Sequence, residues 1–222
     1  SPVSFKRKVR DLVEDKDGPV WGDVAKQLTL KADAHCILES RGRERKKIEE
    51  ELKSGAFAGK YWDGRLFGNT FLEEGASTSI KTGVAQFGLG VSLAPIQIER
   101  LTNTNKAGVQ EGKDRGMAPL GYRIVQHGVY CMPFFVNPTA ARKTSCTKQD
   151  VDLLLRLIPY AYPHTASYVR PMVGIRHAWF IEHKSALGSC SAARTSREAP
   201  ASVPVASHCV PNRHRQRRRC HW

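Results

Sequence analysis

The run YWDGRLFGNTF, residues 61–71, places aromatic rings and two opposite charges in a short segment with two glycines. We predict that this run forms the edge of a strand leading into a tight turn. Because strand side chains two positions apart share a face, Asp63 and Arg65 then lie on one side of the strand, where they can form a salt bridge. Alternatively, Arg65 faces a phosphate while Trp62 and Phe67 provide packing or stacking surfaces. The run alone leaves both interpretations open.

The composition is that of a basic chain that can bury a core. The 222 residues are 41% hydrophobic, which fits one sizeable domain or two small ones. Lys and Arg outnumber Asp and Glu by 35 to 21, so the net charge of +14 favours a polyanionic partner, either nucleic acid or membrane phosphate. No run approaches the roughly 20 apolar residues that span a bilayer, and the N-terminal SPVSFKRKVR has no apolar signal core. We therefore expect a soluble, cytoplasmic protein whose partner is nucleic acid and not a membrane.

The cysteines do not form a metal-binding pattern. None of the six belongs to a C-x-x-C pair or to a short-spaced Cys/His quartet of the kind that binds zinc. Scattered reduced thiols are typical of a cytosolic chain. We expect no metal and no other cofactor.

An amphipathic helix is predicted from SFKRKVRDLVED, residues 4–15. Phe5, Val9 and Leu12 recur at helical spacing, and Ser4 is a candidate N-cap. Its other faces carry a set of cations, Lys6, Arg7, Lys8 and Arg10. These cations form either a solvated face or a phosphate-binding face, and their density favours phosphate. Since such a helix normally packs on a strand laid down before it, we also expect that an N-terminal strand is missing.

A glycine-rich strand is predicted within residues 75–100, where bulky side chains such as Phe87 and Leu89 alternate with small ones. Its bare face permits close approach either by another backbone or by a ligand. Residues 102–119 are polar and glycine-rich, which is typical of an exposed arm or a functional loop. Met117 on this arm is either a wedge between bases or a simple contact at the arm tip.

The remaining elements follow from periodicity and composition. Residues 17–60 contain a charged helix with few apolar anchors and are interpreted as a peripheral excursion. Strand-like composition returns over residues 121–136 and again over residues 175–184. The run TKQDVDLLLRLIPYAY, residues 147–162, predicts a helix that begins with a capping box. Beyond residue 190 the chain is rich in Ala, Ser, Pro and Arg without periodicity, which predicts a disordered tail over residues 191–222.

Several ordered motifs together resemble a known family. They are SFKRKVR, YWDGRLFG, IKTGVAQF followed by SLAPI, GYRIVQHGVY, TKQDVDLLLRLI and IRHAWFIEHKSALG. With these motifs the chain resembles CRISPR-associated family seven, the repeated backbone subunit of type I Cascade surveillance complexes, and most closely its I-B/I-C branches. The resemblance runs from about residue 4 to about residue 190.

The resemblance implies an α+β fold with an RRM-like (ferredoxin-like) palm over residues 1–190. A finger excursion at about 17–60 and a thumb arm at about 102–119 are inserted in it, and the family's first strand and the loop after it are absent. It further implies a non-catalytic protein that binds CRISPR guide RNA (crRNA), polymerises along it with copies of itself and other Cascade subunits, and presents it to target DNA.

Ten residues are predicted to form the RNA-binding site: Lys6, Arg7, Lys8, Arg10, Arg65, Lys81, Gly83, Gln86, Arg115 and Met117. The helix cations are expected to contact phosphates. Lys81, Gly83 and Gln86 are expected to form a site where the RNA closely approaches the protein backbone and side chains. Tyr122 and His127 either stack on bases or occupy ordinary sheet positions.

Two alternative functions compete with guide-RNA binding. The first is a metal-dependent endoribonuclease that uses Asp114 on the arm, but only Glu111 lies near it and two cations flank it, whereas metal-assisted cleavage usually needs clustered acids. His177 and His183 lie too far apart on a strand to act as a coupled acid–base pair. The second is a stand-alone RNA-binding module, which explains the charge but not the series of motifs. We therefore predict that the protein is not an enzyme.

Overall fold

The computed structural model describes residues 1–40, 48, 50–51, 54–68, 82–104, 119–183, 185–186 and 188. The helices are α1 (Pro2–Glu14), α2 (Pro19–Leu28), α4 (Phe57–Lys60), α5 (Trp62–Phe67), α6 (Pro138–Thr144) and α7 (Lys148–Leu157), with 3-10 turns η1 (Ala32–His35) and η2 (Ile158–Tyr160). The strands are β1 (Ala85–Phe87), β2 (Val91–Ser92), β3 (Ile98–Thr104), β4 (Pro119–Val125), β5 (Tyr130–Cys131) and β6 (Phe134–Val136). The described chain is therefore α+β, as predicted.

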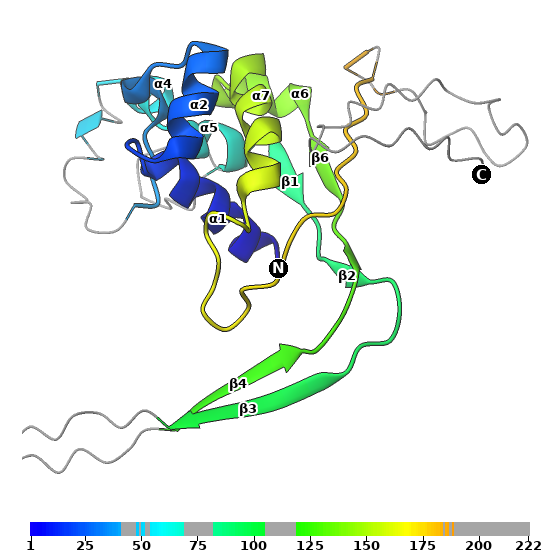
Figure 1. Ribbon diagram of the computed structural model, residues 1–222. Coiled ribbons are helices and arrows are strands. Elements are labelled where there is room, and N and C mark those ends of the chain that lie inside the picture. Colours follow the sequence, from blue (N-terminus) through cyan, green and yellow to red (C-terminus); the bar gives the residue numbers. More distant parts are fainter. Residues whose placement is uncertain are drawn as a thin grey trace, which may run out of the picture.

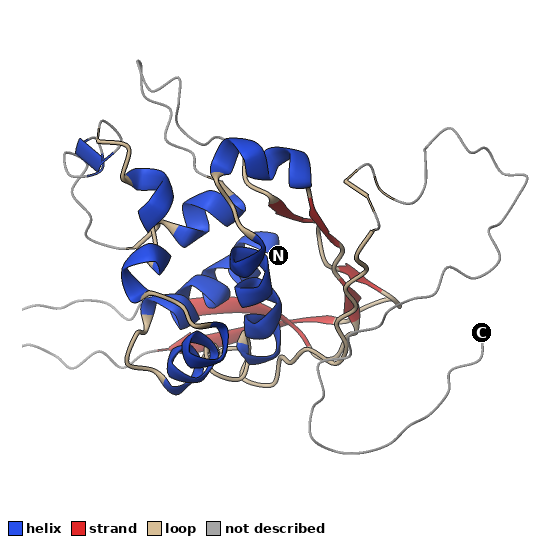
Figure 2. Cartoon of the chain, turned by 90° about the horizontal axis from the view of Figure 1, so that it is seen from above, coloured by secondary structure: helices blue, strands red, loops and turns tan. Residues whose placement is uncertain are grey.

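The helices gather into one body, and a two-stranded ribbon made of β3 and β4 runs below it (Figure 1). The view from above in Figure 2 shows this ribbon crossing beneath the helices, while β1 and β6 lie to one side of them. Strands β2 and β5 connect the ribbon to the body (Figure 1). The apolar core is therefore formed almost entirely by helices, which pack beside the short β1–β6 strand pair.

Helix α1 forms as predicted and begins slightly earlier. Ser1, and not Ser4, is its N-cap, and the Ser1 side chain accepts a hydrogen bond from the Ser4 backbone nitrogen at 3.4 Å. Phe5, Val9 and Leu12 are buried in the main core. The apolar stripe read from the sequence is thus the packed face of the helix.

The run that begins at Tyr61 is a helix, so the predicted strand edge is wrong. The Arg65 nitrogen donates to the Tyr61 carbonyl at 3.1 Å, and Gly68 ends the helix with a φ of 81°. All six residues of α5 are buried, so burial on every side of the helix overrides the strand-like pattern. Trp62 and Phe67 lie in the core with their ring centroids 5.6 Å apart, so these rings serve packing and not base stacking.

Helix α2 packs into the same core, so the start of the segment predicted as a peripheral excursion is not peripheral. Val20, Trp21 and Val24 are buried there. Helix α7 begins at the predicted capping box, in which Thr147 and Asp150 bond reciprocally. The charged helix predicted within residues 41–55 falls largely outside the described residues.

The described strands form three separate two-stranded sheets, in the pairs β1–β6, β2–β5 and β3–β4, all antiparallel. Residues 121–125 and 130–136 carry strands as predicted. Residues 175–183 were predicted as a strand but are assigned to none of these sheets. Their composition suits a strand, but a strand also needs a neighbouring strand with which its backbone can form hydrogen bonds. Among the described helices, none is long and apolar enough to cross a membrane.

Candidate nucleic-acid interface

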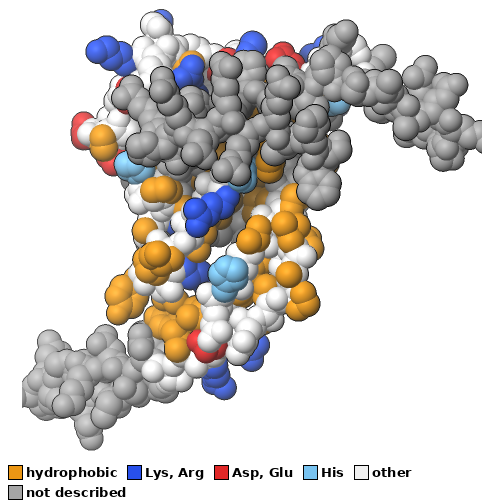
Figure 3. Space-filling model, turned by 45° about the vertical axis from the view of Figure 1, so that its right-hand side comes forward, with side chains coloured by type: hydrophobic (Ala, Val, Ile, Leu, Met, Phe, Trp, Pro, Cys, Tyr) orange, Lys and Arg blue, Asp and Glu red, His pale blue; other side chains and the backbone are white. Residues whose placement is uncertain are grey.

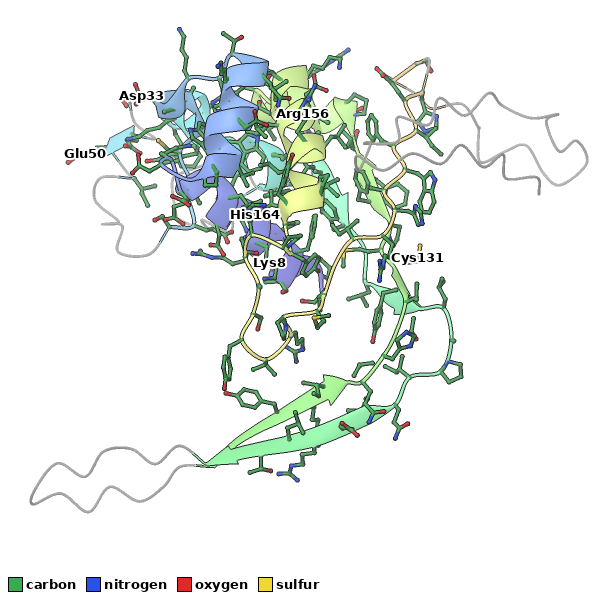
Figure 4. All side chains as sticks on the ribbon, in the orientation of Figure 1. Lys8, Asp33, Glu50, Cys131, Arg156 and His164 are labelled. Atoms are coloured by element: carbon green, nitrogen blue, oxygen red, sulfur yellow. The ribbon has the colours of Figure 1, made fainter. Side chains whose placement is uncertain are left out.

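The predicted phosphate-binding cations of α1 make contacts within the protein. Arg7 donates to the Glu39 carbonyl at 2.9 Å and pairs with Asp11 at 2.8 Å. The Lys8 ammonium bonds the Thr165 carbonyl and its hydroxyl, so α1 is tied to the loop after α7, where Figure 4 places Lys8 near His164. These two cations remain half-exposed, and their phosphate contacts remain predictions.

Lys6 and Arg10 lie against the ring of Phe67, at 5.2 and 5.1 Å from its centroid. Burial, followed by the nearby Arg10 charge, lowers the pKa of Lys6. Arg10 is only 5% exposed, and it pairs with Asp63 at 2.9 Å and with Glu39 at 3.0 Å. Arg10 therefore belongs to the interior, and the prediction that it contacts phosphate does not fit its position.

Asp63 is the anchor for this arginine. Its carboxylate also accepts hydrogen bonds from the backbone nitrogens of Leu38 at 2.6 Å and Glu39 at 3.2 Å. A buried carboxylate needs such a full set of donors, because burial penalises an uncompensated charge. The Asp63–Arg10 pair thus fastens α1 and the 38–39 segment onto α5.

Arg65 is held by a second buried ion pair, so the phosphate interpretation of this residue is wrong. Its guanidinium bonds both oxygens of Asp150, from Nε at 3.1 Å and from Nη2 at 2.6 Å. The other donors reach three backbone carbonyls, those of Ala34, Ala58 and Gly59. Since arginine has five N–H donors, no donor is left for a phosphate.

Asp150 links this pair to the start of α7. Its carboxylate accepts from the Thr147 nitrogen at 2.8 Å as part of the capping box. Burial would raise the pKa of Asp150, but the hydrogen bonds from Arg65 and Thr147 outweigh burial and keep this pKa below its ordinary value. Asp150 is therefore charged at neutral pH, and Arg65 pairs with it while Asp63 pairs with Arg10, so the predicted Asp63–Arg65 salt bridge is wrong.

The close approach predicted around Gly83 is made by the chain itself. A Cβ at Gly83 would lie 2.1 Å from the Phe67 carbonyl carbon and 2.3 Å from the Gly68 nitrogen. Gln86 is exposed and donates to the Gly83 carbonyl at 3.0 Å. The protein's own backbone thus fills the space beside the buried Gly83, so the prediction that RNA approaches closely there does not fit its position. Three further predicted RNA-binding residues lie outside the described residues: Lys81, Arg115 and Met117.

A broad groove of about 2450 Å³ opens between the strands and the extended segment 169–183. Its floor is apolar and includes Phe5, Phe87, Phe134 and Tyr162. Figure 3 shows the hollow with basic and histidine side chains beside apolar ones. The groove therefore combines an apolar floor with a polar, charged rim.

The rim carries arginines that are not among the ten predicted RNA-binding residues. Arg123, Arg170 and Arg176 line the groove and are exposed, and within the described part of the chain they form no ion pair. Arg170 donates to the Arg123 carbonyl at 3.2 Å, which joins the segment after α7 to the ribbon. Three carboxylates also line the groove: Glu99, Asp152 and Glu182. Glu99 accepts a bond from Gln126, and Asp152 pairs with Lys148.

Aromatic rings lie beside these arginines. The His177 and Trp179 rings stack with centroids 5.3 Å apart, and Trp179 is 65% exposed. His127 is exposed on the rim, whereas Tyr122 is half-buried opposite Leu101 in the ribbon. Exposed rings interleaved with arginines suit single-stranded nucleic acid, because every base has a face that can stack. The run Arg-His-Ala-Trp at residues 176–179, in the predicted strand, was the sequence feature that could have indicated this surface.

Catalytic groups do not converge in the described part of the chain. No three His, Cys, Asp or Glu residues there lie close enough to hold a metal ion, and Asp114 lies outside it. Partial burial raises the pKa of the Cys146 thiol to about 12, so this half-buried thiol is not a thiolate at neutral pH. The absence of catalysis stays a prediction.

Comparison with known proteins identifies the family. None of the curated proteins matches the chain at a significant level. A solved structure described as "CRISPR RNA-guided surveillance complex, pre-nicking" is 14% identical, with a TM-score of 0.40, and the match covers 72% of this chain and 61% of that one. The match to the family sequence model covers residues 1–216 and so continues beyond residue 190, where the motifs quoted above end. The chain belongs to the family described as CRISPR-associated protein Cas7.

Proposed function

We propose that this protein is a non-catalytic backbone subunit of a type I Cascade complex, of the I-B/I-C kind, that binds CRISPR guide RNA. Family membership supports the assignment, and one observation carries it: arginines that form no ion pair within the described residues are exposed on the groove rim, as is a stacked aromatic pair. Neutralisation of phosphates by cations and stacking of bases on aromatic rings are the two interactions that hold single-stranded nucleic acid without reading its sequence.

In this proposal the protein holds the RNA mainly by its backbone and leaves base edges free for pairing with target DNA. The helical body is the centre of an RRM-like palm, and the β3–β4 ribbon is the base of the thumb arm. Copies of the chain then assemble along one RNA together with other Cascade subunits. No step of this function requires bond cleavage.

The test is a binding titration of the 222-residue chain with a fluorescent, unstructured single-stranded RNA, followed by anisotropy over a range of salt concentrations. We expect tight binding to RNAs of unrelated sequence, with an affinity that falls steeply as salt rises because bound phosphates have released counterions. A duplex RNA of the same length serves as the control, since its stacked bases are not available to the rim. No binding to the single strand, or stronger binding to the duplex, would contradict the proposal.

A further inference from the structure

Two arginines face each other across the ribbon. Arg100 on β3 is the register partner of Arg123 on β4, and both side chains are exposed. Directly opposite residues of an antiparallel pair share a face and have Cβ atoms roughly 4.5–5.5 Å apart, where like charges destabilise the pairing. The ribbon therefore carries an unfavourable charge pair at a fixed position.

Nothing described on this face offsets the two positive charges. The same face carries Ile98 with Val125, and Thr102 with Gly121, none of which is acidic. Glu99 points to the opposite face and accepts a hydrogen bond from Gln126. The arginines of α1 differ, because Arg7 and Arg10 each have carboxylate partners.

A third guanidinium reaches the same strand. Arg170, in the segment after α7, donates to the carbonyl of Arg123 at 3.2 Å. The loop after α7 descends toward β4, so a segment distant in sequence supplies this charge (Figure 1). Arg170 is exposed as well and forms no ion pair within the described residues.

We infer that Arg100, Arg123 and Arg170 form a phosphodiester-binding site for the RNA at the base of the ribbon. A planar guanidinium presents paired donors that match phosphate oxygens, and a bound phosphate supplies the negative charge that the ribbon lacks. This inference rests on the proposed function and names the part of the surface that grips the RNA backbone. It adds phosphate contacts on the ribbon to those predicted for Arg7 and Lys8 on α1.

The test compares R100Q/R123Q with R142Q/K143Q in the full chain. The control removes two exposed cations from the last turn of α6 and so loses the same charge away from the ribbon. For single strands each lost phosphate contact lowers the slope of log K against log salt by about 0.7, so we expect a decrease of about 1.4 for the ribbon variant. At about 0.1 M salt this corresponds to roughly 25-fold weaker binding. Adding R170Q should lower the slope by about 0.7 more, and the control should keep the wild-type slope.

The thermal midpoint separates binding from folding. Because the two arginines repel each other, R100Q/R123Q should melt at the wild-type temperature or above it. A lower midpoint would show that they stabilise the ribbon, which overturns the inference. A wild-type slope in R100Q/R123Q, or an equal loss in the control, also overturns it while leaving RNA binding intact. Failure of the wild-type chain to bind RNA would instead reject the proposed function.

Discussion

Replacing Asp150 with asparagine should cost more stability than any exposed change on the same helix. The side chains of Asp150 and Arg65 are only 2% and 7% exposed, and Asp150→Asn leaves the guanidinium charged and buried. Breaking a buried pair by removing one partner costs about 3–5 kcal/mol. Since a domain is stable by only about 5–15 kcal/mol, this change consumes a large part of the total.

Asp152→Asn is the matched control. Asp152 lies one half-turn further along α7 and pairs with Lys148 at 3.2 Å, but Lys148 is 78% exposed. Such a surface pair contributes at most about 0.5 kcal/mol. Urea unfolding followed by circular dichroism gives the free energy of unfolding for both variants. A loss in D150N no larger than that in D152N would refute the claim that the Arg65–Asp150 pair holds the core.

The same pair sets an acid limit on stability. The folded-state pKa of Asp150 lies below the ordinary value of 3.8, so its contribution is complete above that pH. It is lost as pH falls below 3.8 toward the lower folded-state value. The difference in unfolding free energy between wild type and D150N should therefore be constant near neutral pH and shrink in strong acid. A difference that grows in acid would contradict this assignment.

Two further predictions concern packing and chemistry. Gly83→Ala should destabilise the chain by about 1–3 kcal/mol or more, because the new Cβ would meet the Phe67 carbonyl carbon at 2.1 Å. Gly121→Ala is the control, since a Cβ there has open space and should change stability little. Equal thermal midpoints for the two variants would show that the backbone contact at Gly83 is loose. Labelled RNA incubated with the protein and Mg²⁺ should stay intact on a denaturing gel, and cleavage that Asp114→Ala abolishes would establish the endoribonuclease alternative instead.

Local rules predicted the helices with a clear apolar stripe. For α1 the spacing of Phe5, Val9 and Leu12 predicted both the helix and its buried face, and for α7 the capping box of Thr147 and Asp150 predicted where the helix begins. The same rules failed for α5, where burial on all sides erases the periodicity that distinguishes a helix from a strand. Residues 175–183 failed for a different reason, since strand pairing depends on a neighbour that composition does not specify.

The site was harder to predict than the fold because charge alone does not say which cations are free. Arg10 and Arg65 looked like phosphate ligands in the sequence, but their carboxylate partners Asp63 and Asp150 lie 53 and 85 residues away. Arg123 and Arg170, which have no carboxylate partner in the described part of the chain, stand singly in strand-like or loop-like sequence. Only the fold shows that the first group is buried and the second lines an open groove.

The number of copies bound per RNA tests the central claim most directly. Native mass spectrometry would count protein chains on single-stranded RNAs of two lengths, one twice the other, at a salt concentration where binding is saturated. A backbone subunit should load more copies on the longer RNA, in proportion to its length, because each copy covers a fixed stretch of phosphates. A single copy on both RNAs, or copies that do not increase with length, would contradict the assignment of this protein as a repeated guide-RNA backbone subunit.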